Sequence, residues 1–295
     1  MKCINALVSS SKTRYKSVQW AERDNGHYTY YTQTGEIYQE GDVIRFPCRK
    51  CYWCLQARAR EWTLRCALEA REHKENCILT LTYENSPREL QERDVQLFLK
   101  RLRKHIAPAK LRYFYGGEYG TLKKRPHYHM IIFGWQPNDC HLWQVIKGIN
   151  YYNSPTIDKL WGHGYVTIDC NCKDVGISYT CGYVMSKLFA STPKGLRKPY
   201  QRMSNRPGIG YKYFEQNSDA IYDTGIYHDG KKMSPPKYFD IKYRAIVGEE
   251  VWEIIRDKRM EYIRADPLGH AETQDQNKRK IKNILQKTID KRLGL

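Results

Sequence analysis

The chemistry of this sequence begins with His127-Tyr128-His129, because alternate residues of a β-strand point to the same face of a sheet. Two neighbouring imidazoles can bind one divalent cation when a third ligand lies nearby. Glu118 stands nine residues earlier, so a hairpin would bring its carboxylate beside both rings. Two histidines and one carboxylate leave positions open for water and a phosphate oxygen, as catalytic metal sites do. Two surface histidines at a strand end are the alternative.

Tyr179 and Tyr183 form the second pattern. Their spacing of four residues places both rings on one face of a predicted helix, and Lys187 continues the same row. A tyrosine hydroxyl, with a pKa of about 10, becomes a useful nucleophile when a metal polarises the phosphate and a cation meets the developing charge. Taken alone, such a pair favours core packing, so the catalytic interpretation depends on the metal site.

Cys48, Cys51 and Cys54 form two overlapping C-x-x-C spacings, which suit a tetrahedral Zn2+ ion. The chain has ten cysteines and no apolar leader, so we expect thiols or metal ligands instead of disulfides. The zinc would be structural and would fix the N-terminal segment at the start of the next helix. A reduced cluster without metal is the alternative. Candidates for the fourth ligand are Cys3 first, then Cys66 and His73.

The 295 residues include 50 Lys plus Arg and 32 Asp plus Glu, a formal net charge of +18. This excess favours a polyanionic partner, most commonly nucleic acid, over a merely solvated surface. The 24 tyrosines suit base stacking in single-stranded nucleic acid, although most are packing residues. No apolar run is long enough to span a bilayer, so no membrane partner is expected. The candidate DNA-binding residues are Arg58, Arg60, Arg65, Lys100, Arg101, Arg103, Lys104, Arg125 and Arg206.

Hydrophobic periodicity predicts the elements that must position these residues. We expect a hairpin with its turn near Gly35, a Gly-rich connection over 116–125 and a loop-rich region after residue 190. Strands are predicted over 78–83, 111–115, 127–133 and 164–168, and helices over 55–74, 92–106, 155–161, 175–189, 251–264 and 278–293. The expected domains are the zinc-knuckle segment 1–55, the catalytic core 56–190 and a basic, loop-rich and helical region 191–295.

A glutamate, a His-x-His strand and a two-tyrosine helix, in this order, resemble HUH endonucleases of the two-tyrosine type. Further segments make residues from 1 to about 245 resemble the replication initiation proteins of gokushovirus-type microviruses, which are small single-stranded DNA bacteriophages. These segments are Cys48-x-x-Cys-x-x-Cys54, Arg60-Glu-Trp62, Arg65-Cys66, Leu79-Thr-Leu-Thr-Tyr83, Phe98-Leu-Lys-Arg-Leu-Arg103, Gly117-Glu-Tyr-Gly120, Arg125-Pro-His-Tyr-His129 and Met203-Ser-x-Arg-Pro-Gly-Ile-Gly210.

The resemblance implies an α+β fold: an RNA-recognition-like antiparallel sheet with packed helices, an N-terminal zinc knuckle and a helical C-terminal tail. It implies a site-specific DNA endonuclease and strand transferase. Such an enzyme nicks origin DNA, forms a 5′-phosphotyrosine link and starts rolling-circle replication of circular single-stranded DNA. In this sequence Glu118, His127 and His129 match the ligands for Mg2+ or Mn2+, and Tyr179 and Tyr183 match the nucleophiles.

The partners implied by the resemblance are single-stranded and supercoiled viral origin DNA, and the host DNA polymerase and helicase, in the cytoplasm of the infected bacterium. Relatives often carry a basic residue just before the second tyrosine, where this chain has Gly182; Lys187 can supply that charge. Two other interpretations stay open. One is a non-catalytic, zinc-stabilised protein that binds single-stranded nucleic acid. The other is a mobilisation or transposition enzyme that uses the same chemistry.

Overall fold

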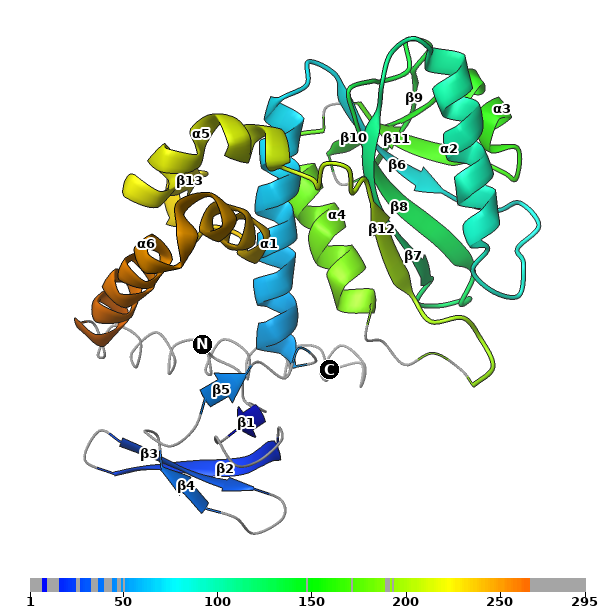
Figure 1. Ribbon diagram of the computed structural model, residues 1–295. Coiled ribbons are helices and arrows are strands. Elements are labelled where there is room, and N and C mark those ends of the chain that lie inside the picture. Colours follow the sequence, from blue (N-terminus) through cyan, green and yellow to red (C-terminus); the bar gives the residue numbers. More distant parts are fainter. Residues whose placement is uncertain are drawn as a thin grey trace. The chain divides into compact units, whose positions relative to one another are not determined.

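The computed structural model describes residues 51–146, 148–170, 172–188 and 194–265, with residues 49 and 192 and five strands between residues 7 and 46 (Figure 1). The chain divides into two compact units, one ending at Pro236 and one beginning at Lys237, and each is described by itself. Two of the predicted zinc ligands and one predicted helix lie outside the described residues: Cys3, Cys48 and 278–293.

A seven-stranded sheet, antiparallel at every pairing, forms the centre of the first unit, in the order β12-β7-β8-β6-β11-β10-β9. Its strands are β6 (Asn76–Leu81), β7 (Arg112–Tyr119), β8 (Pro126–Phe133), β9 (His141–Ile146), β10 (Ile149–Asn153), β11 (Val166–Asp169) and β12 (Tyr200–Met203). The helices are α1 (Tyr52–Arg71), α2 (Glu92–Ile106), α3 (Pro155–Trp161), α4 (Asp174–Lys187) and α5 (Tyr211–Asp223). The predicted α+β class with an antiparallel sheet is confirmed.

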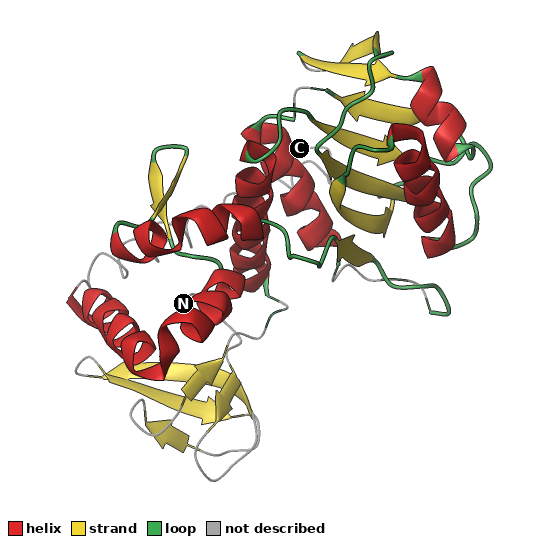
Figure 2. Cartoon of the chain, turned by 45° about the horizontal axis from the view of Figure 1, so that its top comes forward, coloured by secondary structure: helices red, strands yellow, loops and turns green. Residues whose placement is uncertain are grey.

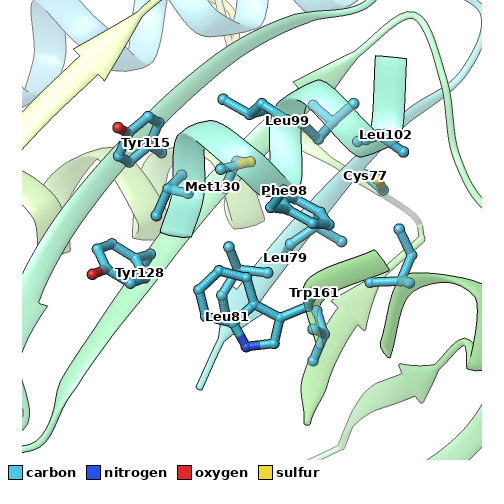
Figure 3. Packing of buried hydrophobic residues seen from close by; sticks show 14 of the residues in the cluster. Cys77, Leu79, Leu81, Phe98, Leu99, Leu102, Tyr115, Tyr128, Met130 and Trp161 are labelled. Atoms are coloured by element: carbon cyan, nitrogen blue, oxygen red, sulfur yellow. The ribbon is translucent and has the colours of Figure 1, made fainter. Parts of the chain in front are cut away.

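Helices cover both faces of this sheet (Figure 2). Because strand side chains alternate, β8 sends Tyr128 and Met130 into one core and Ile131 and Phe133 into the other. The first core is completed by α2 and α3, whose Phe98, Leu99, Leu102 and Trp161 pack over the sheet (Figure 3). The second core is completed by α1 and α4. The odd-numbered residues of β8, which include both histidines, therefore face α4.

Helix α2 has the bounds that the sequence predicts. Its apolar residues fall on one stripe, with acidic side chains in the first turn and basic ones in the last, as the helix dipole favours. Arg101 extends from this helix to the end of α3, where its Nε donates to the carbonyl of Leu160 at 2.7 Å and its Nη2 to that of Trp161 at 3.0 Å. This predicted DNA-binding residue therefore joins two helices of the core.

The prediction of a Gly-rich connection from residue 116 is wrong over residues 116–119, because β7 continues through Tyr119. Gly116 lies under α4: a Cβ at this position would stand 2.4 Å from Cγ1 of Val184. On the other face, a Cβ at Gly117 would stand 2.9 Å from the ring of Tyr128. The two glycines permit close packing on both sides of one strand, which is a recognised use of glycine inside sheets.

The region after residue 190 contains more regular structure than predicted. Strand β12 pairs with β7, so the sheet continues past the expected domain boundary at residue 190. Helix α5 and a hairpin of β13 (Ile226–His228) and β14 (Lys231–Met233) follow. Helix α1 holds this region: Nε of the buried Arg65 donates to the carbonyl of Ile209 at 3.0 Å, and Glu69 Oε2 accepts from the amide of Gly210 at 2.6 Å.

A five-stranded antiparallel sheet precedes α1, in the order β4-β3-β2-β1-β5. Its strands are β1 (Leu7–Ser9), β2 (Lys16–Asp24), β3 (His27–Thr32), β4 (Ile37–Gln39) and β5 (Ile44–Phe46). Strands β3 and β4 pair on either side of Gly35, which confirms the predicted hairpin.

The second unit begins with α6 (Lys237–Ala265), which includes the predicted helix over 251–264. Gly248 interrupts the helix with φ 82°, a value that glycine adopts without strain. Arg259 Nη2 then lies 3.2 Å from Asp240 Oδ1, so the two halves of the helix contact each other. Among the described residues, no helix is long and apolar enough to cross a membrane.

Gly116→Ala should lower the free energy of unfolding by about 1–3 kcal/mol, the usual cost of overpacking, because its Cβ would overlap Val184. Urea unfolding of the first unit measures this. In a Val184→Ala background the same change should cost clearly less, since the overlapping methyl groups are gone. Gly182→Ala is the matched control: nothing lies within 4 Å of its added Cβ, so it should be neutral or stabilising. Equal effects at both glycines would contradict the packing argument.

Candidate active site

The register of β7 and β8 places Glu118 directly opposite His127. Glu118 Oε1 lies 2.6 Å from His127 Nε2 and 3.5 Å from His129 Nε2. The connection between the strands is closed by a hydrogen bond from the amide of Gly120 to the carbonyl of Arg125, at 2.9 Å. The predicted carboxylate and both predicted imidazoles therefore meet at one point on the face of the sheet that α4 covers.

The Glu118 carboxyl is only 2% exposed. Burial alone would raise its pKa, but its interactions with His127 and His129 lower the pKa to about 2, so the group is a carboxylate. Burial lowers the pKa of His129, and the charges of His127 and Lys187 lower it further, against the opposing effect of Glu118. A carboxylate beside a neutral imidazole is the protonation state that metal ligands need.

Both oxygens of Glu118 and Nε2 of His129 are buried and make no well-formed hydrogen bond with the described residues, although His127 Nε2 approaches Glu118 Oε1 to 2.6 Å. Their ligand atoms and that of His127 all lie within 4.8 Å of one another. Buried polar atoms that lack well-formed hydrogen bonds are costly, so three of them at one point suit a bound ion. The donor set of two imidazole nitrogens and a carboxylate suits a divalent cation with open coordination positions. The three residues fit such an ion.

Two further contacts orient the imidazoles, and sequence reasoning missed both. Nδ1 of His127 donates to the carbonyl of Arg125 at 3.2 Å, so Nε2 is the nitrogen that faces Glu118. Nδ1 of His129 hydrogen-bonds Oγ1 of Thr80 at 3.2 Å. Such partners fix the ring orientation of metal-binding histidines. The signal for Thr80 was its place on β6, opposite His129 in the sheet.

Helix α4 brings Tyr183 and Lys187 to the same place. The ring of Tyr183 lies 5.0 Å from that of His129, edge to face. Lys187 Nζ lies 3.7 Å from Glu118 Oε2, 3.1 Å from Thr121 Oγ1 and 5.1 Å from the centre of the Tyr183 ring. Burial first, and then the charge of Glu118, raise the pKa of Tyr183 to about 12, so its hydroxyl is protonated.

Tyr179 stacks on the ring of Tyr183, with centroids 5.8 Å apart and an interplanar angle of 18°. Its side chain is 65% exposed. The helical face predicted from the spacing is therefore real, but the two tyrosines differ: Tyr183 lies against the histidines, and Tyr179 lies one turn further out.

The candidate DNA-binding residues do not form one surface. Arg65 and Arg101 serve the fold through the contacts given above, and Arg103 covers the ring of Tyr113. Arg125 is exposed beside the site and donates to the carbonyl of Glu84 at 3.0 Å and to that of Tyr83. The DNA-binding role stays a prediction for every member of the set. The remaining candidates are exposed or partly exposed: Arg58, Arg60, Lys100, Lys104 and Arg206.

Two of the predicted zinc ligands, Cys51 and Cys54, are buried together at the start of α1, with Trp53 packed against them. Cys66 lies on the same continuous helix, twelve residues beyond Cys54. At a rise of about 1.5 Å per residue, the two positions are about 18 Å apart, and His73 is further still. Neither Cys66 nor His73 can complete a site with Cys54.

Comparison with known proteins extends this picture. A family model described as Replication-associated protein ORF2 matches residues 76–188, the stretch from β6 to the end of α4. Replication-associated protein ORF2 of Spiroplasma virus 4 is 30% identical over 285 residues, which cover 88% of this chain and 86% of that protein. Replication-associated protein VP4 of Bdellovibrio phage phiMH2K is 31% identical over 223 residues, which cover 71% of this chain and 70% of that protein. The chain belongs to the microvirus replication-associated proteins.

A third member, Replication-associated protein ORF4 of Chlamydia phage 1, is 32% identical over 220 residues. That match covers 69% of this chain but only 55% of the Chlamydia phage protein, so the chain spans about half the length of that relative. No solved structure matches the chain. The predicted resemblance to microvirus replication proteins is thus confirmed, and the residues that converge on Glu118 all lie within the stretch that the family model matches.

We expect Mn2+ to bind at the convergence of Glu118, His127 and His129. Glu118→Gln keeps the side-chain shape but removes the charge, so it should weaken Mn2+ binding by at least about 10-fold, because even the outer partners of metal ligands contribute that much. Isothermal titration calorimetry or the electron paramagnetic resonance signal of Mn2+ measures the loss. His105→Ala, at an exposed position on α2, is the matched control and should bind as the parent does. Unchanged binding by Glu118→Gln would exclude this site.

Proposed function

We propose that this protein is a metal-dependent endonuclease and strand transferase of the HUH type that nicks phage origin DNA and starts rolling-circle replication of a circular single-stranded genome. The observation that carries the proposal is the convergence of Glu118, His127 and His129 with Tyr183 and Lys187. The names of the relatives, which are replication-associated proteins of phages, support a role in phage replication. The alternative interpretations, a non-catalytic protein that binds single-stranded nucleic acid or a purely structural role, do not explain why these polar groups are buried together.

The reaction exchanges one phosphodiester for another. The hydroxyl oxygen of Tyr183 attacks the scissile phosphorus, the bond from phosphorus to the 3′ oxygen breaks, and the phenolic proton replaces the phosphorus on that oxygen. The products are a 5′-phosphotyrosine and a free 3′-OH, which is a primer for a host DNA polymerase. A divalent cation, Mg2+ or Mn2+, held by Glu118, His127 and His129 would polarise the phosphate.

Lys187 is placed to balance the charge that develops in this step. Its Nζ is close to both the Glu118 carboxylate and the ring of Tyr183. Electrostatic groups held in position before the reaction contribute most to such catalysis. Lys187 thereby supplies the charge that relatives often carry immediately before the second tyrosine, where this chain has Gly182.

The two tyrosines then take successive roles. Tyr183 attacks first because it lies against the histidines, and Tyr179, stacked on it and exposed, serves when the regenerated origin is cut at termination. The partners in this proposal are single-stranded and supercoiled origin DNA, and a host polymerase and helicase in the cytoplasm of the infected bacterium. A mobilisation or transposition enzyme would use the same steps on other DNA, and the relatives favour phage replication.

A covalent adduct tests this proposal directly. The protein is incubated with a pool of single-stranded oligonucleotides that includes the phage origin, with Mn2+, and adducts are identified by denaturing gel and peptide mass spectrometry. Tyr183→Phe should reduce the first adduct to background, and Tyr179→Phe should keep it, because only Tyr183 lies at the histidines. Tyr227→Phe, an exposed tyrosine on β13, is the matched control. An adduct formed by the Tyr179→Phe/Tyr183→Phe protein would refute the assignment.

We also propose that Cys51 and Cys54 bind a structural Zn2+ together with Cys3 and Cys48, within a zinc-knuckle segment over residues 1–55. A buried pair of cysteines at the first turn of α1 supports it. The expected catalytic core over 56–190 is completed by β12, which comes from the basic region over 191–295, so the two parts share one sheet.

Cys51→Ser should lose the bound zinc and lower the melting temperature, because a structural zinc contributes folding free energy. Zinc content by atomic spectrometry and thermal unfolding measure the two effects. Cys66→Ala is the control: it removes a buried cysteine of the same helix that is too far away to be a ligand, so zinc should stay bound. Full zinc content in Cys51→Ser would exclude the site.

A further inference from the structure

A cavity of about 420 Å³ opens at the end of the sheet where β6 ends and β11 begins. Its volume is in the range of ligand sites. Aromatic rings and hydrogen-bond acceptors share its lining, which includes Tyr83, Glu84, Asn85, Asp158, His163 and Tyr165. None of these residues belongs to the convergence at Glu118, so the cavity is a second feature of the same domain.

The cavity lies close to the histidines. Leu81 pairs with Tyr128 on one side and with Val166 on the other, so the next residues along, Thr82 and Tyr165, follow His127 across the sheet. The amide and Oγ1 of Thr82 both donate to the carbonyl of Tyr165, at 3.2 and 2.7 Å, which extends this ladder. Two strand spacings, about 10 Å, separate His127 from the row that carries Tyr165.

Tyr165 also faces the side of the sheet that carries the histidines. Val166 and Ile168 are buried in the core under α2 and α3, so Tyr165 points to the opposite face by strand alternation. Its side chain is 67% exposed although its backbone is fixed by Thr82. A rigidly held, exposed tyrosine is the type of side chain on which an unpaired base stacks.

The rim of the cavity is built before any ligand arrives. The amide of Glu84 donates to the carbonyl of His163 at 2.8 Å, and a Cβ at Gly164 would stand only 2.4 Å from that amide nitrogen. The two loops that form the walls therefore touch through their backbones, and Gly164, at φ 149°, is the residue that permits it. A preformed site loses little conformational entropy when it binds.

The charges select what enters. The carboxylates of Glu84 and Asp158 would repel a phosphate. Oδ1 of Asp158 already accepts from the amide of Val166 at 2.9 Å, and Glu84 can accept a hydrogen bond from an exocyclic amino group, as acidic side chains do with cytosine. Arg125 lies at the rim, exposed, with its Nη2 bound to the carbonyls of Tyr83 and Glu84. If Arg125 bound a phosphate of the DNA backbone, the base of that nucleotide would lie over the cavity and the adjacent nucleotide would lie near His127.

We propose that this cavity binds one unstacked base of the DNA strand that carries an exocyclic amino group, and so not thymine, with Tyr165 as its stacking surface and Glu84 as an acceptor for the amino group. This inference rests on the proposed function, because it assigns a nucleotide position next to the scissile phosphate. The cavity reads a base by shape, stacking and hydrogen bonding, as sites for flipped bases do.

Fluorescence anisotropy with short labelled oligo(dA), oligo(dC) and oligo(dT), in buffer without Mg2+ or Mn2+ so that no cleavage occurs, tests the cavity. The parent protein should bind oligo(dA) or oligo(dC) more tightly than oligo(dT), because thymine is the one base of the three without an exocyclic amino group. Tyr165→Ala should weaken binding of the preferred oligonucleotide about 10-fold, within the range of one lost base stack, and Tyr165→Phe should restore it. Glu84→Gln should reduce the preference over oligo(dT).

Equal binding of the three homopolymers by the parent protein, a preference for oligo(dT), or unchanged binding by Tyr165→Ala would each overturn the proposal. The adduct assay separates this result from the endonuclease itself. If the parent protein and Tyr165→Ala form the adduct equally well at limiting DNA, the endonuclease proposal stands and the proposed role of the cavity is excluded. If the base preference depends on Tyr165 but no adduct forms, the proposed role of the cavity stands and the endonuclease proposal is excluded.

Discussion

The pairing of Glu118 with His127 across β7 and β8 is the constraint on which the site depends. Side chains alternate along a strand, so a slip of one residue would move both histidines to the other face of the sheet. The hairpin cannot slip without cost, because the same strand buries Tyr128 and Met130 in the opposite core. The position of a buried carboxylate between two imidazoles is thus fixed by the packing of the whole sheet and not by the exposed loop that joins the strands.

A second constraint sets the distance between the sheet and the tyrosine helix. Val184 of α4 occupies the space that a side chain at residue 116 would fill, so the helix approaches β7 closely only because residue 116 is glycine. Tyr183 and Lys187 flank Val184 on the same helix. Because the helix is held close to the sheet at Val184, Tyr183 reaches His129 and Lys187 reaches Glu118. Burial of Glu118 and closeness of the helix reinforce each other, because each excludes water from the same small volume and strengthens the interaction of its charges.

Sequence patterns predicted the parts of this architecture that depend on local periodicity. Helix α2 has the predicted bounds because its apolar stripe and terminal charges agree, and the histidines share a face because β8 is a strand. The patterns failed where the structure of a segment depends on contacts with another helix or strand. The glycines of β7 indicate a loop by composition, and only the helix above them explains a strand. Thr80 orients His129 from another strand. The apolar residues of β9 do not alternate with polar ones, and Leu142, Trp143 and Val145 are all exposed, so no strand pattern reveals it.

The net charge shows how many basic residues the chain has, but not where the structure places them. A charge of +18 predicts a polyanionic partner, but two of the basic side chains that the sequence offers for it, Arg65 and Arg101, donate hydrogen bonds to backbone carbonyls of the core. Helix α2 also lies against the face of the sheet opposite the histidines. Among the described residues, Lys187 of α4 lies against the Glu118 carboxylate, and Arg125 of the β7–β8 connection lies beside the site. In the proposed reaction, position relative to one buried carboxylate therefore decides which charges take part, and the total charge does not.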